Sequence, residues 1–231
     1  MYQGMKKYSL LVLIIYLFIF SFASGHVSHY KKVKFLKYEL FLNDKLIGNH
    51  VFDFKQEGNL LYVKSKGDFK VNTLGVVLMD YRTESEEVYK NGQLIKYNSK
   101  TFQNDKEKFA NVILNEKNKL YINGSSYKGE TENTSLIGSW WNHQIVENSK
   151  QISPISGRII KQKVKFLGKK NILINGKGYN ALHFHFFSDD NKPKNKKKLN
   201  IQVWYDSKTL LWLKASYEKF GKWEYRLTEV K

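Results

Sequence analysis

Two histidines one residue apart, His183 and His185, form the pattern in this sequence that comes nearest to a metal site. In a β-strand, residues i and i+2 point to the same face, so both imidazoles could reach one ion. The apolar residues of the same run, Leu182, Phe184 and Phe186, would then fill the opposite face. A protein metal site needs further ligands, and none lies nearby in the sequence. The pattern favours a polar sheet face, and we predict neither a metal nor another cofactor.

His50 is a second candidate for chemistry, because its neighbours predict an inward orientation. Period-two alternation places Leu46, Gly48, His50, Phe52 and Phe54 on one face of a strand. A buried neutral histidine needs hydrogen-bond partners. Three interpretations remain open: an interior histidine with its partners satisfied, a polar contact in a ligand cavity, or a general base.

A hydrolytic site would have to be assembled from Glu84, Glu86, His50 and Ser139. Paired carboxylates act on a glycosidic bond only across a substrate cleft. An ion pair between Glu84 and Arg82 on a strand is the ordinary alternative. The chain has no Cys, no G-x-S-x-G, no H-E-x-x-H, no phosphate loop and no calcium loop. The sequence therefore favours a non-enzymatic protein and identifies no catalytic residue.

The most concentrated aromatic feature is Trp140-Trp141-Asn142. Indoles beside an amide suit sugars, lipids and peptides, and they also suit a plug that closes the end of a barrel. As a lid, the segment would leave a pocket reached by His50, Asn142 and Tyr81; as a plug it would leave none. The predicted ligand-binding residues are His50, Tyr81, Trp140, Trp141 and Asn142.

The elements that must position these side chains are strands, because alternation of period two dominates after Val33. Turn signals such as Asn91-Gly92 and Asn175-Gly176 separate the runs, and short connections favour an antiparallel meander. Only residues 134–149 break the pattern, as a short helix capped by Thr134 or Ser135 or as an ordered loop. Expected strands are 36–42, 46–54, 60–66, 68–73, 76–89, 93–103, 108–115, 119–123, 158–167, 170–175, 178–187, 198–206, 209–219 and 222–229.

More than ten antiparallel strands in one sheet tend to curl. We therefore predict an all-β fold with one short helical insertion, built as a strongly bent antiparallel sheet, a half-barrel or a flattened barrel. Residues 26–231 show no internal repeat and no domain linker, so they are predicted to form a single domain.

Residues 1–25 have the three parts of a secretory signal. Lys6 and Lys7 precede an apolar run of about 15 residues, which is shorter than the roughly 20 that a spanning helix needs. Small residues follow at Ala23, Ser24 and Gly25. The mature protein is therefore expected in the periplasm or outside the cell.

The chain carries 39 Lys+Arg against 21 Asp+Glu, a net charge of +18. Only three of these cations are Arg. Recognition of phosphate and bases favours the guanidinium fork, so we predict no nucleic-acid partner. The densest run, Lys192 to Lys198, is expected to be a solvated loop. Loose contact of the lysine-rich surface with an anionic envelope is the partner interaction that the charge allows.

Several short patches occur in a characteristic order: Gly48-Asn49-His50, Tyr89-Lys90-Asn91-Gly92, Trp141-Asn142 and Trp204-Tyr205-Asp206. This order resembles a family of exported bacterial proteins of unknown function, over residues 35–229. The members of that family are distantly similar to the lipoprotein carriers LolA and LolB, which hold acyl chains in the concave face of a half-barrel. The resemblance implies a bent sheet and a carrier role, and it assigns no catalytic residue.

Three functions follow from these patterns. The first is an exported protein that binds a lipid or another apolar or amphipathic ligand in the concave face. The second is a non-enzymatic structural or interaction module of the envelope. The third is a hydrolase of an envelope polymer.

The signal pattern predicts the N-terminus of the mature protein. Cleavage after Ala23 or Gly25 fits the small-x-small rule, so the exported chain should begin at Ser24 or His26. N-terminal sequencing of the exported protein measures this directly. A chain that retains Met1 would show that the segment is an uncleaved anchor.

Overall fold

The protein is described by a computed structural model that places residues 30, 32–73, 76–193 and 197–231. The predicted signal segment lies outside these described residues.

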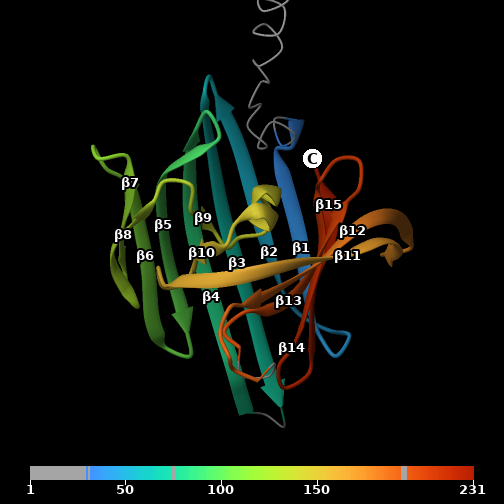
Figure 1. Ribbon diagram of the computed structural model, residues 1–231. Helices are drawn as coiled ribbons and strands as arrows, with labels where there is room; N and C mark the ends of the chain where they lie inside the picture. Colours follow the sequence, from blue (N-terminus) through green and yellow to red (C-terminus); the bar gives the residue numbers. More distant parts are fainter. Residues whose placement is uncertain (1–29, 31, 74–75, 194–196) are drawn as a thin grey trace, which may run out of the picture.

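One curved sheet dominates the fold (Figure 1), and it contains 15 strands. The all-β fold class is confirmed. The strands are β1 (Phe35–Leu42), β2 (Lys45–Glu57), β3 (Leu60–Thr73), β4 (Val76–Lys90), β5 (Gln93–Gln103), β6 (Lys106–Leu114), β7 (Lys119–Gly124), β8 (Tyr127–Glu132), β9 (Leu136–Ile137), β10 (Lys150–Ile152), β11 (Ile159–Ile174), β12 (Lys177–Ser188), β13 (Asn200–Asp206), β14 (Trp212–Glu218) and β15 (Lys222–Val230).

The sheet is a meander whose first and last strands pair with each other. Its order is β8-β7-β6-β5-β4-β3-β2-β1-β15-β14-β13-β12-β11-β10-β9. Each strand pairs with its neighbour in sequence, except that β8 and β9 form the two edges of the sheet. Tight turns make this possible, and residues such as Asn43, Asp44 and Asn91 have the positive φ that hairpin turns require. The sheet therefore curls strongly but stays open between β8 and β9.

A β-bulge in β2 changes the predicted alternation. Leu40 pairs with Gly48, but Phe41 pairs with Leu46, so Ile47 is an extra residue in β2. Ile47 packs against a buried cluster of the core, and Leu46 is 53% exposed. The prediction that Leu46 shares the inward face of His50 was therefore wrong, because a bulge reverses the facing of residues beyond it.

The segment from residue 134 to residue 158, here called the plug segment, lies inside the curve of the sheet (Figure 1). It contains β9, β10 and a single 3₁₀ helix, η2 (His143–Glu147). Of the two alternatives left open for residues 134–149, a helix capped by Thr134 or Ser135 was wrong, because helix η2 is capped by Asn142 and spans only five residues. Most of the segment is an ordered loop, as the other alternative predicted. The carbonyl of Pro154 fixes the segment to β5, because it accepts hydrogen bonds from Tyr97 Oη at 2.9 Å and Ser99 Oγ at 2.6 Å.

The plug segment joins the two halves of the sheet into one core. Gln162 Nε2 of β11 donates to the carbonyl of Ile145, and Tyr205 Oη of β13 donates to that of Trp140. The largest fully buried side chains include Trp141, Trp212 and Tyr38. None of the helices in the described part of the chain is long and apolar enough to cross a membrane.

Strand bounds differ from the expected ones in two ways. Residues 60–73 and 159–174 are continuous strands rather than pairs of shorter ones, and the longer of them has a bulge next to Gly168. Strands β8, β9 and β10 were not predicted. They are short, and β8 alternates glycine and threonine with charged residues, so no apolar period marks it.

Candidate functional site

Trp141 holds the plug segment in the core. Its indole has no exposed surface, and its Nε1 donates to Glu87 Oε1 at 2.9 Å. Its ring contacts those of Tyr30, Phe54 and Tyr89 at centroid distances of 5.3, 5.3 and 5.6 Å. These contacts give Trp141 the role of a plug, one of the two roles expected for the Trp140-Trp141 pair.

Glu87 is a buried carboxyl held by donors on both oxygens. Tyr89 Oη donates to Glu87 Oε2 at 2.5 Å, while the Trp141 indole donates to Oε1. Burial raises the pKa of Glu87, and the hydrogen bonds from Trp141 and Tyr89 oppose the rise. The carboxyl is therefore an internal anchor for the plug segment.

The side chain of Asn142 also has a structural role, as the N-cap of helix η2. Its side chain is buried, and its Oδ1 accepts a hydrogen bond from the backbone N–H of Gln144 at 3.1 Å. This is the N-cap bond of η2. We therefore leave Trp141 and Asn142 out of the candidate site, although the sequence placed both in it.

The side chain of Trp140 points in a different direction from that of Trp141, toward Trp212 and Tyr225. Its backbone has a φ of 53°, in the left-handed region, so the chain turns sharply between the two indoles. The half-buried Trp140 ring contacts Trp212 at 5.7 Å and Tyr225 at 6.2 Å, centroid to centroid. Its Nε1 is buried and has no hydrogen-bond partner among the described residues.

His50, on β2, lies beside Tyr225, the same ring that Trp140 contacts. It stacks on Phe52 at 4.4 Å, and its ring centroid lies 6.2 Å from that of Tyr225. Space for the ring comes from Gly67 on β3, where an added Cβ would lie 3.3 Å from the imidazole. Burial lowers the pKa of His50 to about 4, so the ring is neutral at neutral pH. Its Nε2 is buried without a partner in the described structure.

Tyr225 is the centre of these contacts. Trp212 of β14 lies 5.5 Å from it and is fully buried, and its Nε1 is a third ring nitrogen without a hydrogen bond. The hydroxyls of Tyr81 and Tyr217 are close enough to influence Tyr225, whose pKa burial raises well above its ordinary value. We call this set the Tyr225 cluster, consisting of His50, Tyr81, Trp140, Trp212, Tyr217 and Tyr225.

The Tyr225 cluster brings together three of the five predicted site residues and adds three that the sequence analysis missed. Trp212, Tyr217 and Tyr225 lie on the last two strands, far in sequence from His50. Alternation alone could have placed them on an inner face, but their meeting with His50 depends on the pairing of β1 with β15.

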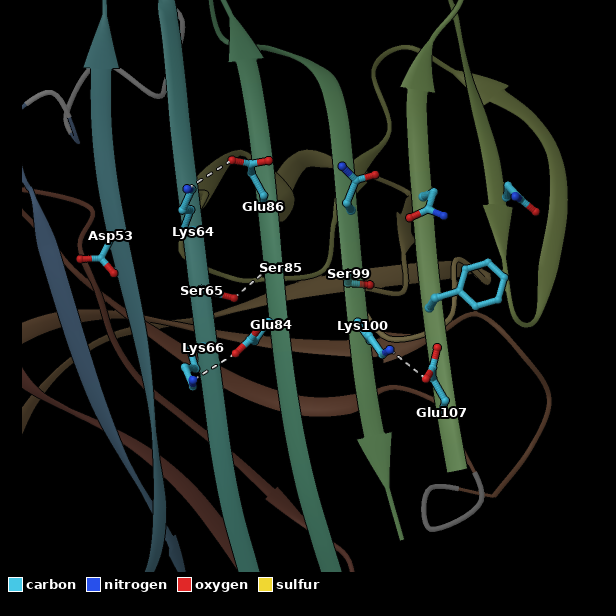
Figure 2. Close-up of a pocket in the computed structure, with 14 residues that line it drawn as sticks. Asp53, Lys64, Ser65, Lys66, Glu84, Ser85, Glu86, Ser99, Lys100 and Glu107 are labelled. Atoms are coloured by element: carbon cyan, nitrogen blue, oxygen red, sulfur yellow. Dashed lines mark hydrogen bonds and ion pairs between the residues drawn. The ribbon is translucent and has the colours of Figure 1, made fainter. Parts of the chain in front are cut away.

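The carboxylates proposed for hydrolysis lie on the opposite, outer face of the sheet (Figure 2). Lys66 Nζ lies 3.0 Å from Glu84 Oε1, and Lys64 Nζ lies 3.8 Å from Glu86 Oε1. Arg82 pairs with Asp80 at 3.5 Å, so the expected Glu84–Arg82 pair is corrected to Glu84–Lys66. These carboxylates therefore face away from His50, and the four hydrolase candidates do not form one site.

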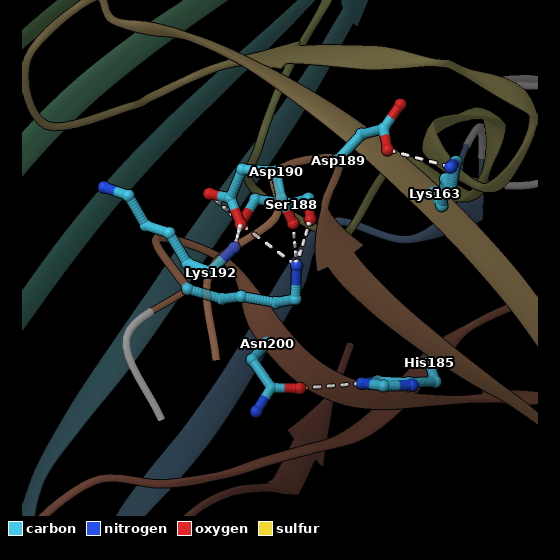
Figure 3. Close-up of polar contacts among 8 residues, drawn as sticks. Lys163, His185, Ser188, Asp189, Asp190, Lys192 and Asn200 are labelled. Carbon is cyan, nitrogen blue, oxygen red and sulfur yellow. Dashed lines mark hydrogen bonds and ion pairs between the residues drawn. The ribbon is translucent and has the colours of Figure 1, made fainter. Parts of the chain in front are cut away.

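His183 and His185 each bind a separate amide. His183 Nε2 lies 2.7 Å from Gln202 Oε1, and His185 Nε2 lies 2.7 Å from Asn200 Oδ1, as Figure 3 shows for the second pair. His183 also stacks on Trp204 at 4.3 Å. Within the described ranges, no group of three or more His, Asp or Glu side chains could hold a metal ion.

The lysine-rich loop after β12 is anchored by one of its own lysines. Lys197 Nζ donates to the carbonyl of Ser188 at 3.0 Å and to the carbonyl of Asp190 at 2.5 Å. Nearby, Lys163 pairs with Asp189 at 2.8 Å (Figure 3). These bonds order the start of the loop and leave Lys192 exposed at the surface.

Comparison with known proteins identifies the fold but no activity. The model of a family described as a domain of unknown function, DUF6134, matches residues 38–228. A crystal structure of a β-barrel-like protein of domain of unknown function DUF1849 from Brucella abortus superposes with a TM-score of 0.61 at 12% identity, covering 86% of this chain and 97% of that one. No curated protein matches the sequence. At this identity the likeness concerns the fold alone.

Replacing Trp141 by alanine should destabilise the fold strongly. Deleting a fully buried indole costs about 3–5 kcal/mol of unfolding free energy, and Glu87 would also lose a donor. Urea unfolding measures the loss, with Trp140→Ala, whose ring is only half-buried, as the milder comparison. Equal losses in the two variants would contradict the plug role of Trp141.

Glu87 should make stability depend on pH. Because burial raises its pKa, the folded state binds a proton more tightly than the unfolded state. Its contribution to stability is therefore greatest at low pH and is lost as the pH rises from the unfolded pKa through the raised folded pKa. Urea unfolding across this window should show the fall in the wild type and a flatter profile in Glu87→Gln. Parallel profiles would argue against a raised pKa.

Proposed function

Residues 38–228 make this chain a member of the DUF6134 family, and on that premise we propose that it binds a small amphipathic ligand at the Tyr225 cluster. The ligand would lie on the inner face of the sheet, beside the plug segment. The family description carries no activity, so the proposal rests on the chemistry of the cluster.

The observation that carries the proposal is the set of unpaired ring nitrogens of His50, Trp140 and Trp212. A buried polar group without a hydrogen bond costs about 1–3 kcal/mol, and native structures contain few of them. Three around one tyrosine are an unusual concentration. A ligand with oxygen acceptors would satisfy the two indole N–H groups, which can only donate.

The aromatic rings supply the rest of the binding energy. All members of the cluster except Trp212 are half-buried, so their rings keep some exposed surface. Covering apolar surface contributes about 25 cal/mol per Å². A ligand with an apolar body and a polar oxygen end fits both the rings and the nitrogens.

Export and carriage extend this proposal. In this proposal the protein is exported to the periplasm or outside the cell, with the signal pattern of residues 1–25 in support. The resemblance to relatives of LolA and LolB suggests an acyl chain as the apolar body. The lysine-rich surface would favour loose contact with an anionic envelope. Binding is favoured over hydrolysis because Glu84 and Glu86 are paired with lysines on the other face.

The proposal is tested with a fluorescent amphipathic probe, 11-(dansylamino)undecanoic acid, which has an apolar chain and a carboxylate that supplies oxygen acceptors. We expect the wild type to bind it and Trp140→Ala to bind it about tenfold more weakly, which corresponds to about 1.4 kcal/mol. Trp204→Ala is the matched control, because its half-buried indole stacks on His183 outside the cluster. It should bind like the wild type.

Native mass spectrometry of protein purified from its own envelope provides the second measurement. It should detect a co-purifying molecule on the wild type that Trp140→Ala retains poorly. Unchanged probe binding in Trp140→Ala, or wild-type protein that binds neither probe nor cellular ligand, would overturn the proposal.

A further inference from the structure

A separate hollow lies on the outer face of the sheet, across strands β2 to β7 (Figure 2). Its volume is about 890 Å³, and a second hollow of about 310 Å³ continues it along β3 to β5. We call the larger hollow the outer groove. It is open to solvent and is lined by Asp53, Lys64, Ser65, Lys66, Glu84, Ser85, Glu86, Asn98, Ser99, Lys100, Glu107, Phe109, Asn111 and Asn123.

Three asparagines form a row across one end of the outer groove. Asn98 lies directly opposite Asn111, and Asn111 lies directly opposite Asn123, on the neighbouring strands β5, β6 and β7. Adjacent strands are about 4.8 Å apart, so the row offers an amide at each such step. None of the three side chains has a hydrogen bond to another described residue. Each therefore has one oxygen acceptor and two N–H donors available for a ligand.

The choice of asparagine at these positions is informative. Asparagine is depleted in strands, where β-branched and aromatic residues fit better. Asn111 and Asn123 are exposed and contribute nothing to the core, and Asn98 is half-buried. Strands disfavour asparagine, and these three side chains make no hydrogen bond to another described residue. The row is best explained by contacts outside the protein.

An aromatic ring stands beside the amide row. Phe109 lies two residues from Asn111 on β6, so both point to the outer face. The ring is half-buried, and it lies opposite Lys100 of β5. It offers an apolar surface on which the C–H face of a sugar ring can pack.

The charges of the outer groove nearly cancel, with one carboxylate in excess. Three lysines face four carboxylates, and the pairs Lys64–Glu86, Lys66–Glu84 and Lys100–Glu107 lie at 3.8, 3.0 and 3.0 Å. Such a surface has no net field that would attract a polyanion, despite the charge of +18 on the whole chain. The groove therefore does not favour an anionic ligand, and its amide side chains favour a ligand rich in hydrogen-bonding groups.

The position of the outer groove also excludes a peptide that adds to the sheet as an extra strand. Peptides commonly add to a free sheet edge, where backbone groups are unpaired. The outer groove lies over strands β2 to β7, and each of these strands is paired on both sides. Recognition there must come from side chains alone, and their donors and acceptors match hydroxyl groups.

We propose that the outer groove binds a neutral oligosaccharide. The chain lies across β5 to β7, its hydroxyl and amide groups bond the side chains of Asn98, Asn111 and Asn123, and one sugar ring packs on Phe109. This site is on the opposite face from the Tyr225 cluster and acts independently of it.

The test uses three uncharged probes, cellohexaose, maltohexaose and hexa-N-acetylchitohexaose, in isothermal titration calorimetry. At least one should bind the wild type. Asn111→Ala and Phe109→Ala should each weaken that binding about tenfold, a loss of about 1.4 kcal/mol. Thermal unfolding checks that both variants are folded.

The matched control is Asn171→Ala. Asn171 is an exposed asparagine that lies opposite Asn180 on the neighbouring strand, outside the outer groove. It should leave oligosaccharide binding unchanged, and so should Trp140→Ala on the inner face. The inference is overturned if none of the three probes binds at millimolar concentration, or if Asn111→Ala binds as well as Asn171→Ala.

Discussion

The pairing of β1 with β15 is the contact on which the rest of the structure depends. It joins residues from opposite ends of the chain, from Leu36 with Val230 to Leu42 with Trp223. The turn between β1 and β2 is also hydrogen-bonded to β15, because Lys222 N–H donates to Asn43 Oδ1 at 2.8 Å. Contacts of such large sequence separation carry a loop-closure cost and form slowly. Once formed, they turn two meanders into one curved sheet, and the Tyr225 cluster lies across this junction.

The plug segment fills the concave side of the sheet, and its two adjacent tryptophans have different roles. The positive φ of Trp140 sends the two indoles in different directions. Trp141 is bonded to Glu87 in the core, whereas Trp140 keeps an exposed part of its ring beside Tyr225. One sharp backbone turn thus converts a hydrophobic dipeptide into a structural contact and a candidate binding contact.

Alternation in the sequence was sufficient to predict an all-β curved sheet, and it failed where its period is interrupted or absent. Leu46 was misplaced because a bulge at Ile47 has no signature in a period-two pattern. Strand β8 was missed because it has few apolar residues. Glu87 could have been recognised, since it shares a face with Ser85 and Tyr89 and not with its neighbour Glu86. The contact between His50 and Tyr225 could not have been predicted in this way, because it depends on the pairing of the first strand, β1, with the last, β15.

The opening between β8 and β9 has a consequence for the association of the protein with other chains. The two edges are joined by residues 133–135, and Lys150 of β10 forms an ion pair with Glu132 of β8 across the opening. Free edges are templates on which other chains can add strands and aggregate. Here one edge is only two residues long, and the other carries exposed charges at Lys128 and Glu130. Both features disfavour the addition of strands from other chains at the opening.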